Sequence, residues 1–539
     1  MAPSRVYIEG DPARIRYKIT GAGGDLLLRA KVVDLYGRQR FFEDVPLKDS
    51  QALAGEMAFD AFPDQLFGAF RVEAWLVDRS GKVASECFDL PVLRVRRPRH
   101  LEEDAPASPF GVHTSSPLRY LEMAKRIGIN WVRLHDAGAR DVGWYFLEPK
   151  PGEWQFQDAD IHRYRNNHLL LLGELGTAPA WATNLKDIGP HNPYWDRYYQ
   201  PNNLEDYGRY VRTMVDRYRN DIAAWDVWNE PWNHAWWGIG YDGTKKDASA
   251  YQTSKEPQKD FVALSRMAYQ SAKQANPQAV LMGVNTTVAE PGDSKSRFDG
   301  TSWTKGFVEA GGLDCEDVIS FHNYTSGASL FPGDTVEAGM ATAFGPIRAV
   351  EGKIPKPVWM TEGSPVSGLS GAGFYNQTLP FPLPENIDAT SDKICRYVLS
   401  NLANGVSKVF LYSMHTHNYL SLDTRALILA SDDGSPHPSA AAFANMTYWI
   451  EGKTFSRRVS LRPRLNAYVF EGGGQTTTVF AAVPGGKEPT AVPNLPGMVC
   501  YDLYGNTLQP GASTETIFYG VSNGITSDEL DRKLKELFN

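Results

Sequence analysis

The chain has 539 residues, more than one hydrophobic core usually holds, and this length predicts about two to four domains. Hydrophobic residues make up 42% of the chain and charged residues 22%, which is typical of a globular protein. Lys and Arg together number 55, whereas Asp and Glu number 63, so the formal net charge is −8. Phosphate binding needs concentrated positive charge, so the composition argues against a nucleic-acid partner and favours a neutral one.

Four cysteines, Cys87, Cys315, Cys395 and Cys500, lie far apart, without a Cys-x-x-Cys pair. They predict neither a disulfide framework nor a structural metal. The first residues contain no apolar stretch of signal-peptide length, and no window approaches the run of about 18 apolar residues that spans a bilayer. We therefore expect no membrane partner, and a cytoplasmic protein if the chain is complete or a secreted or periplasmic one if a signal peptide was removed.

Residues 1–100 contain short runs in which apolar and polar positions alternate, with turn residues between them. The clearest runs are residues 14–19, 27–33, 70–77 and 87–93. Alternation with a period of two is typical of half-buried strands, so this region is predicted to form a small β-sandwich domain. The basic run 94–100 and the acidic and Pro-rich stretch after it indicate a solvated linker.

From residue 101 to residue 452 the pattern changes to strands that alternate with helices, and eight such units can be counted. Most of the strands are short apolar runs, as expected for strands buried on both faces of a parallel sheet. They cover residues 110–113, 131–135, 169–175, 223–230, 279–285, 318–324, 358–362 and 409–415. Eight units over about 340 residues predict a (β/α)8 TIM barrel, with a doubly wound sheet as the alternative.

Two of the intervening segments carry clear helical signals. Apolar residues between Leu204 and Tyr218 recur at offsets that place them on one face of a helix, and Asn203 can cap its first turn. Ile394, Val398 and Leu402 repeat this pattern, and Gly405 is a suitable stop after them. These helices fit the outer layer of the predicted barrel.

Residues 453–539 return to strand-like alternation, at 464–471, 476–483 and 498–504. The interpretation is a second β-sandwich domain. Its last segment, 527–538, has the spacing of a short amphipathic helix that begins at Ser527.

Two glutamates close predicted barrel strands. Glu230 ends strand four in Trp-Asn-Glu-Pro, and Glu362 ends strand seven in Thr-Glu-Gly. TIM-barrel chemistry takes place at the carboxyl ends of the strands, and strands three apart in a ring of eight face each other across the mouth. Either glutamate alone could be a solvated or salt-bridged residue. As a pair they suit glycosidic cleavage, in which one carboxyl protonates the leaving oxygen and the other attacks the sugar or activates water.

The expected surroundings assign a role to each glutamate. Trp225, Trp228 and Trp232 should give Glu230 an apolar setting, which would raise its pKa and keep it protonated near neutral pH. Glu362 must stay ionised, and Arg133 at the end of strand two is a candidate partner for it. Glu230 is therefore predicted to be the general acid/base and Glu362 the nucleophile of a retaining glycoside hydrolase that needs no cofactor.

With these motifs, residues 105 to 452 resemble the clan A glycoside hydrolases, in which an Asn-Glu pair ends strand four and a second Glu ends strand seven. Within the clan, the run 317–324 and the Arg-Leu-His step at 133–135 are most similar to glycoside hydrolase family 39, which includes β-xylosidases and α-L-iduronidases. Families 5 and 158 stay open as alternatives. The resemblance implies that Asn229 binds the sugar 2-hydroxyl, and that His322 and Tyr324 orient Glu362 or line the subsite.

Further residues at strand ends and on rim loops are candidates for substrate binding. His113 and His135 close strands one and two, and His415 follows strand eight. Aromatic faces stack on the C–H faces of sugar rings, and an aromatic cluster follows Glu230 directly. Its members are Trp232, Trp236, Trp237 and Tyr241. For each of these residues the alternative is structural: a satisfied core hydrogen bond for a histidine, and a loop that packs on itself for the aromatics.

The spacing of His415 and His417, with Asp423 nearby, raises a metal hypothesis, but no third histidine stands at a fixed offset, so we predict no metal. The expected partner is a carbohydrate, and a homo-oligomer stays open. The proposed reaction is double displacement, as in a β-glycosidase or β-xylosidase, with a slight preference for exo action or short oligosaccharides. The alternatives are an endo-acting polysaccharide hydrolase, a transglycosylase, and a catalytically silent carbohydrate-binding protein.

Overall fold

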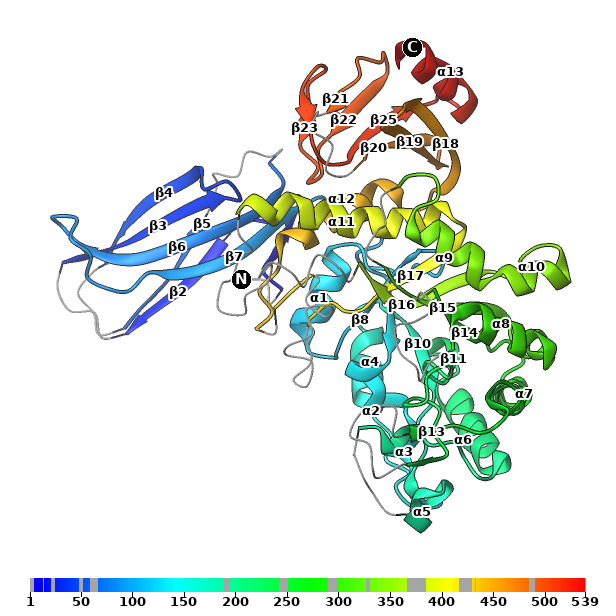
Figure 1. The fold of residues 1–539 in the computed structure, drawn as a ribbon. Helices are drawn as coiled ribbons and strands as arrows, with labels where there is room; N and C mark the ends of the chain where they lie inside the picture. Colours follow the sequence, from blue (N-terminus) through cyan, green and yellow to red (C-terminus); the bar gives the residue numbers. More distant parts are fainter. Residues whose placement is uncertain are drawn as a thin grey trace.

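The structure is a computed structural model. It describes residues 4–12, 14–20, 25–47, 52–58, 66–188, 194–241, 251–288, 298–325, 330–365, 384–415, 429–431, 433–483 and 490–538. Figure 1 shows three parts in chain order: an N-terminal pair of sheets in blue, a central barrel surrounded by helices, and a C-terminal sheet in orange and red.

The N-terminal part is a sandwich of two sheets. Its five-stranded sheet has the order β1-β7-β6-β3-β4, in which only β1 and β7 run parallel. These strands are β1 Val6–Ile8, β3 Leu26–Asp34, β4 Gln39–Pro46, β6 Gly68–Asp78 and β7 Phe88–Val95. The second layer is the antiparallel pair β2 Arg14–Thr20 and β5 Ala52–Ala58. Tyr17 and Ile19 of β2 pack against buried residues of the larger sheet, such as Val72, so a small core lies between the layers.

The central part is a closed barrel of eight parallel strands, in the order β10-β11-β14-β15-β16-β17-β8-β9. The TIM-barrel prediction is confirmed, and the doubly wound alternative is wrong because the last barrel strand, β17, pairs with the first, β8. The strands are β8 Phe110–His113, β9 Trp131–Leu134, β10 Leu170–Leu175, β11 Ile222–Val227, β14 Leu281–Thr287, β15 Val318–Tyr324, β16 Val358–Ser364 and β17 Val406–Leu411.

Helices cover the outside of the barrel (Figure 1). They are α1 Leu118–Arg126, α2 Ala139–Val142, α3 Trp144–Leu147, α4 Asp158–Arg165, α5 Leu185–Ile188, α6 Leu204–Arg217, α7 Pro257–Ala275, α8 Gly300–Glu309, α9 Thr335–Ala343, α10 Gly345–Glu351, α11 Pro384–Ala403 and α12 Pro438–Ile450. The predicted cap of α6 is present, since the Asn203 side chain accepts a hydrogen bond from the Glu205 amide at 3.0 Å. The predicted stop after α11 is Gly405, whose φ of +86° suits glycine.

Two barrel strands differ from their predicted bounds by three residues or more at one or both ends, and the other six by two or fewer. β17 begins at Val406, directly after Gly405, rather than at Val409. β11 ends at Val227, before Glu230, because Trp228 has a φ of +67° and Glu230 a φ of +42°. Left-handed backbone at residues other than glycine is uncommon, and neither residue signals it in the sequence.

The C-terminal part is a six-stranded antiparallel sheet in the order β18-β19-β20-β25-β22-β23. Its strands are β18 Thr454–Arg462, β19 Leu465–Gly472, β20 Gln475–Ala482, β22 Met498–Tyr501, β23 Thr507–Leu508 and β25 Phe518–Asn523. A second layer contains the pair β21 Thr490–Ala491 and β24 Ser513–Thr514, together with α13 Ser527–Phe538. Leu530 and Leu534 of α13 are buried in the core of this part. The helix begins at Ser527 as predicted, but it is Thr526 whose hydroxyl accepts a hydrogen bond from the Glu529 amide.

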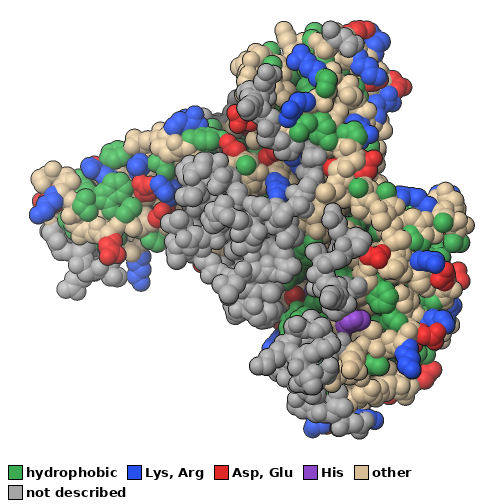
Figure 2. All heavy atoms as spheres, viewed as in Figure 1, with side chains coloured by type: hydrophobic (Ala, Val, Ile, Leu, Met, Phe, Trp, Pro, Cys, Tyr) green, Lys and Arg blue, Asp and Glu red, His purple; other side chains and the backbone are tan. Residues whose placement is uncertain are grey.

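Among the described residues, none of the helices combines the length and the apolar character needed to cross a membrane. Figure 2 shows basic and acidic side chains interspersed over the described surface on one face of the molecule. Such a mixture is typical of solvated faces.

Candidate active site

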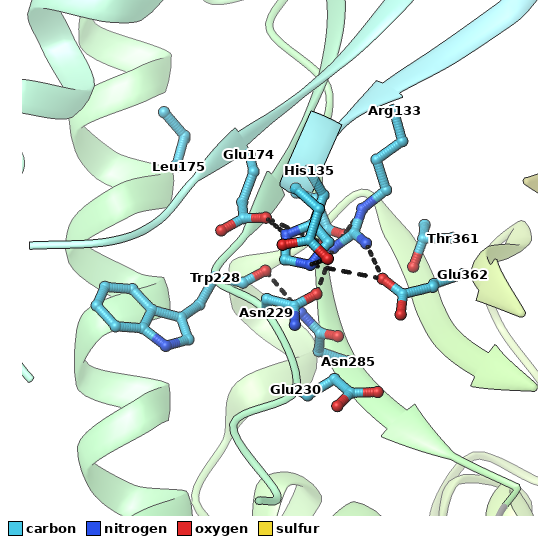
Figure 3. A network of polar contacts seen from close by, with 12 residues as sticks. Arg133, His135, Glu174, Leu175, Trp228, Asn229, Glu230, Asn285, Thr361 and Glu362 are labelled. Atoms are coloured by element: carbon cyan, nitrogen blue, oxygen red, sulfur yellow. Dashed lines mark hydrogen bonds and ion pairs between the residues drawn. The ribbon is translucent and has the colours of Figure 1, made fainter. Parts of the chain in front are cut away.

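The candidate site is assembled around the guanidinium group of Arg133, which lies in β9 and is fully buried. Its Nη1 atom lies 2.8 Å from Glu362 Oε2, at the end of β16. Its Nη2 atom donates to the side-chain oxygen of Asn229 at 3.0 Å. Figure 3 shows these side chains converging from three strand ends. The fold thus brings together residues predicted from strands two, four and seven.

Arg133 also pairs with Asp226, a fully buried carboxyl group in β11. Nε and Nη2 of Arg133 lie 3.1 and 2.9 Å from Asp226 Oδ2. Burial lowers the pKa of an arginine, but Asp226 and Glu362 outweigh it here and raise the pKa of Arg133 above its ordinary value. Burial raises the pKa of Asp226 to about 6, although Arg133 opposes this effect. The guanidinium charge is therefore permanent; Nε and Nη2 hold Asp226, and Nη1 donates to the carboxylate of Glu362.

A second cation lies beside Glu362. His135 donates through Nδ1 to Glu174 at 2.5 Å, while its Nε2 atom lies 3.6 Å from Asp136 Oδ2 and 3.8 Å from Glu362 Oε2. Burial would lower the pKa of His135, but Asp136 and Glu174 raise it to about 9. Burial likewise opposes ionisation of Glu174, whose pKa is nevertheless lowered by the charge and the hydrogen bond of His135. At neutral pH, His135 is an imidazolium ion held by acidic neighbours.

The other oxygen of Glu362 is held by Tyr324, the last residue of β15. The Tyr324 hydroxyl donates to Glu362 Oε1 at 2.7 Å. Both oxygens of Glu362 therefore have a donor, Arg133 on one and Tyr324 on the other. This arrangement suits a carboxylate of fixed orientation.

Glu230 has a different partner, the imidazole of His322 in β15. Their atoms Oε1 and Nδ1 lie 2.9 Å apart. Burial lowers the pKa of His322 to about 3, so the imidazole is uncharged. A neutral imidazole can donate to an ionised carboxyl or accept from a protonated one, depending on its tautomer. His322 is therefore compatible with both protonation states of Glu230.

Two of the tryptophans expected around Glu230 have contacts elsewhere. The indole of Trp228 points away from Glu230 in Figure 3, and its Nε1 atom donates to the carbonyl of Trp236 at 2.5 Å. Trp225 is buried in β11, where its ring lies over Gly173. The direct partner of Glu230 in this structure is a histidine from β15.

One atom each of Glu230, His322 and Glu362 lies within 4.8 Å of the other two, a spacing that a metal site could also have. Both oxygens of Glu362 already accept hydrogen bonds, and the guanidinium of Arg133 would repel a second cation at that place. The trio is better suited to acid–base and nucleophilic chemistry. The metal hypothesis raised by the sequence concerns His415, His417 and Asp423. Of these three residues, His417 and Asp423 lie outside the described residues.

The remaining histidine candidates, His113 and His415, contact other groups. His113 donates from Nε2 to the carbonyl of Thr361 at 2.9 Å, and burial lowers its pKa well below the ordinary value. It therefore fixes the backbone directly before Glu362. His415 stacks on Tyr120, with 3.8 Å between ring centroids, and lies 3.1 Å from the Ser115 hydroxyl. These contacts of His415 fit the structural alternative.

The four aromatic candidates after Glu230 have different surroundings. Trp236 lies 5.5 Å from the ring of His135, at the site itself. Trp237 is enclosed, packs on Phe261 of α7 and donates to the Pro257 carbonyl, as in a loop that packs on its own aromatics. Trp232 is buried. Tyr241 belongs to the short pair of strands β12 Gly240–Tyr241 and β13 Tyr251–Gln252, and it packs beside Leu185 and Tyr199.

Four residues of the network were not among the predicted site residues: Glu174, Asp226, Asp136 and Asn285. Glu174 and Asp226 carry a signal that could have revealed them, because a charged residue inside a buried apolar strand needs a partner. Asp136 directly follows the Arg-Leu-His step and accepts hydrogen bonds from Tyr194 and Tyr412. Asn285 has no comparable signal.

Comparison with known proteins gives a family match and similar structures. The family model for Glycosyl hydrolase family 10 matches residues 141–298, a range that contains Glu230 and ends before Glu362. A family 39 glycoside hydrolase from the gut symbiont Bacteroides cellulosilyticus WH2 has a similar structure, with a TM-score of 0.66 over 97% of this chain and 99% of that chain at 15% identity. A family 30 endoxylanase from Clostridium papyrosolvens C71 has a TM-score of 0.44, covering 79% and 98% at 15% identity.

The family match and the barrel point to the same class of protein. Residues 141–298 match a glycoside hydrolase family of clan A, and the closed eight-stranded barrel is the fold of that clan. The likeness to the family 39 enzyme extends over nearly the whole of both chains and shows that they share a fold.

Proposed function

We propose that the protein is a retaining glycoside hydrolase of the β-glycosidase type, with Glu362 as nucleophile and Glu230 as general acid/base. The observation that carries this proposal is the spacing of the two side chains, whose nearest oxygens lie within 4.8 Å of each other. Retaining enzymes hold their carboxyl groups about 5 to 5.5 Å apart, whereas inverting enzymes need about 6.5 to 9.5 Å to admit a water.

The contacts of each glutamate support its role. Glu362 is fixed by a charged donor and a hydroxyl donor, which orients its oxygens for attack on an anomeric carbon. Glu230 pairs with the uncharged imidazole of His322, which permits it to give a proton to the leaving oxygen and later to take one from water. Double displacement requires one carboxyl group that alternates between acid and base and a second that attacks the sugar as an anion.

A sugar in the subsite beside Glu362 would meet a small set of polar and aromatic groups. The amide nitrogen of Asn229 is buried and has no partner among the described residues, so it can donate to the 2-hydroxyl, as the clan resemblance implies. The imidazolium of His135 and the indole of Trp236 border the same place. We assign them hydrogen bonding and stacking on the sugar, and we propose a terminal β-linked residue, with β-xylosides as the first substrates to test.

The test is the stereochemistry of hydrolysis. A panel of 4-nitrophenyl β-glycosides of xylose, glucose, galactose and glucuronic acid identifies the best sugar, and proton NMR then follows the anomer released from it. Retention predicts that the β-anomer appears first and mutarotates afterwards. If the α-anomer appears first, the enzyme inverts and the proposed roles are wrong.

Variants link this activity to the two carboxyl groups. Glu362→Gln and Glu230→Gln should each reduce kcat/KM by about 10² to 10⁴, the range typical of a lost nucleophile or general acid. Glu316→Gln is the matched control, because Glu316 is a buried glutamate two residues before β15 begins, at the end of that strand away from Tyr324. Unchanged activity of both site variants on every substrate of the panel would contradict the proposed roles, and a wild type that cleaves no substrate of the panel would favour a carbohydrate-binding protein.

A further inference from the structure

The segment that carries Glu230 has an unusual backbone. Trp228 and Glu230 both have left-handed φ values, which cost free energy at residues other than glycine. The ladder between β11 and β14 pairs Trp225 with Leu281 and Asp226 with Met282, and no pairing is described beyond these two. The carbonyl groups of Val227 and Trp228 therefore need donors from elsewhere.

Those donors come from one side chain, the amide of Asn285 in β14. Its Nδ2 atom donates to the carbonyl of Val227 at 3.2 Å and to that of Trp228 at 3.0 Å. Figure 3 shows Asn285 beside the backbone that leads to Glu230. The orientation of this amide is unambiguous, because two carbonyl oxygens can be met only by its NH2 end.

A bulge in β14 turns Asn285 toward β11. Opposite β15, Gly283 pairs with Ile319 and Thr286 with Phe321, so Val284 and Asn285 together face the single residue Ser320. Both bulge residues have left-handed φ values, +63° and +47°. Such a φ is an outlier for a β-branched valine, and the surrounding structure must hold it. The indole of Trp303 does so by donating to the Val284 carbonyl at 2.8 Å.

From this arrangement we infer that Asn285 is a positioning residue for the proposed acid/base, acting through the backbone of residues 227–230. The bulge directs the amide away from the sheet ladder, and the amide replaces the backbone donors that β11 lacks at its end. Without it, the left-handed turn at Trp228 can relax, and the carboxyl of Glu230 moves relative to Glu362. This inference rests on the proposed function, because it assigns Asn285 to the proton-transfer part of that reaction.

The test compares leaving groups. A weakly acidic leaving group such as phenol needs protonation by the acid, whereas 2,4-dinitrophenol departs without it. Asn285→Asp keeps the shape of the side chain but places an oxygen against two carbonyl oxygens. It should lower kcat/KM for the phenyl β-glycoside about 10²-fold, as expected for a displaced catalytic group, and that for the dinitrophenyl β-glycoside far less. Asn285→Ala, which also loses the donor, should behave in the same way.

The chain contains a matched control at Asn445 in α12. This buried amide donates in the same way to two consecutive carbonyls, those of Asp502 at 3.1 Å and Leu503 at 3.2 Å, and it lies outside the site. Asn445→Asp should cause a comparable loss of thermal stability with no dependence of activity on the leaving group. The activities are compared at temperatures where circular dichroism shows every variant to be folded.

Azide provides a second readout that a purely structural role would not change. It attacks the glycosyl-enzyme without base assistance, so it should raise the kcat of Asn285→Asp on the dinitrophenyl substrate and yield a β-glycosyl azide. If the Asn285 variants lose activity equally on both leaving groups and do not respond to azide, the inference is wrong. Glu230→Ala is run in parallel. If it shows the leaving-group and azide effects while the Asn285 variants do not, only the inference fails; if it shows neither, the proposed function fails.

Discussion

The hydroxyl of Tyr324 donates to the proposed nucleophile at 2.7 Å, so Tyr324→Phe removes one hydrogen bond to a charged oxygen. In the first step Glu362 loses its charge as it bonds to the sugar, so loss of this donor hardly raises the barrier. In the second step Glu362 departs and regains its charge, and the missing donor then slows the reaction. Deglycosylation should therefore be the affected step.

The magnitude follows from the difference between two hydrogen bonds. One to an ionised oxygen contributes about 1.5–3 kcal/mol and one to a neutral ester oxygen about 0.5–1.5 kcal/mol. The difference of about 1–2 kcal/mol corresponds to a deglycosylation rate about 5- to 30-fold lower, as an upper limit at full charge development. With a 2,4-dinitrophenyl β-glycoside, kcat and KM should fall together and kcat/KM should change little. A burst of 2,4-dinitrophenol should precede the steady state.

The assay is a stopped-flow measurement of the 2,4-dinitrophenol burst, and Tyr207→Phe is the control. The hydroxyl of Tyr207 also makes a buried hydrogen bond of 2.7 Å, to the carbonyl of Leu175, so the control loses a similar contact away from Glu362. The reasoning is refuted if Tyr324→Phe shows no burst and loses kcat/KM as strongly as kcat.

Two further predictions concern the cations beside Glu362. Arg133→Met removes the nearest counter-charge of the buried Asp226 and Glu362, which should lower the free energy of unfolding by about 3–5 kcal/mol; urea denaturation measures this, and a loss below about 1 kcal/mol would contradict it. The pKa of His135 is raised from 6.5 to about 9 in the folded protein, so its stabilising contribution is complete below pH 6.5 and is lost as the pH rises through about 9. The thermal midpoint should therefore fall more steeply between these pH values in the wild type than in His135→Gln, and equal slopes would contradict the assigned charge.

The sequence predicted the barrel because its strands are apolar runs with polar residues at their ends. That pattern follows from burial on both faces of a parallel sheet, and all eight strands overlap their predicted ranges, with bounds that differ by three residues or more only at β11 and β17. The end of β11 was missed because Trp228 and Glu230 adopt a backbone that sequence patterns assign to glycine. Tertiary contacts from Arg133 and Asn285 hold this segment, and such contacts leave no local signal.

The partners of the two glutamates could be predicted less well than the glutamates themselves. The residues expected to surround Glu230 were tryptophans near it in sequence, but the indole of Trp228 belongs to the packing of the following loop. The group that contacts Glu230 is His322, 92 residues away along the chain. Periodicity places a side chain on a strand, whereas the rotamer that decides its partner depends on neighbours from other strands.

The most direct test of the proposed pairing of Glu230 and Glu362 is to trap the covalent intermediate. The 2,4-dinitrophenyl 2-deoxy-2-fluoro-β-glycoside of the best sugar slows both steps and lets the glycosyl-enzyme accumulate, most strongly in Glu230→Ala. Peptide mass spectrometry should then find one fluoroglycosyl group per chain, attached to Glu362. A label on any other residue, or none on an enzyme that still releases dinitrophenol in repeated turnovers, would contradict the assignment of Glu362 as nucleophile.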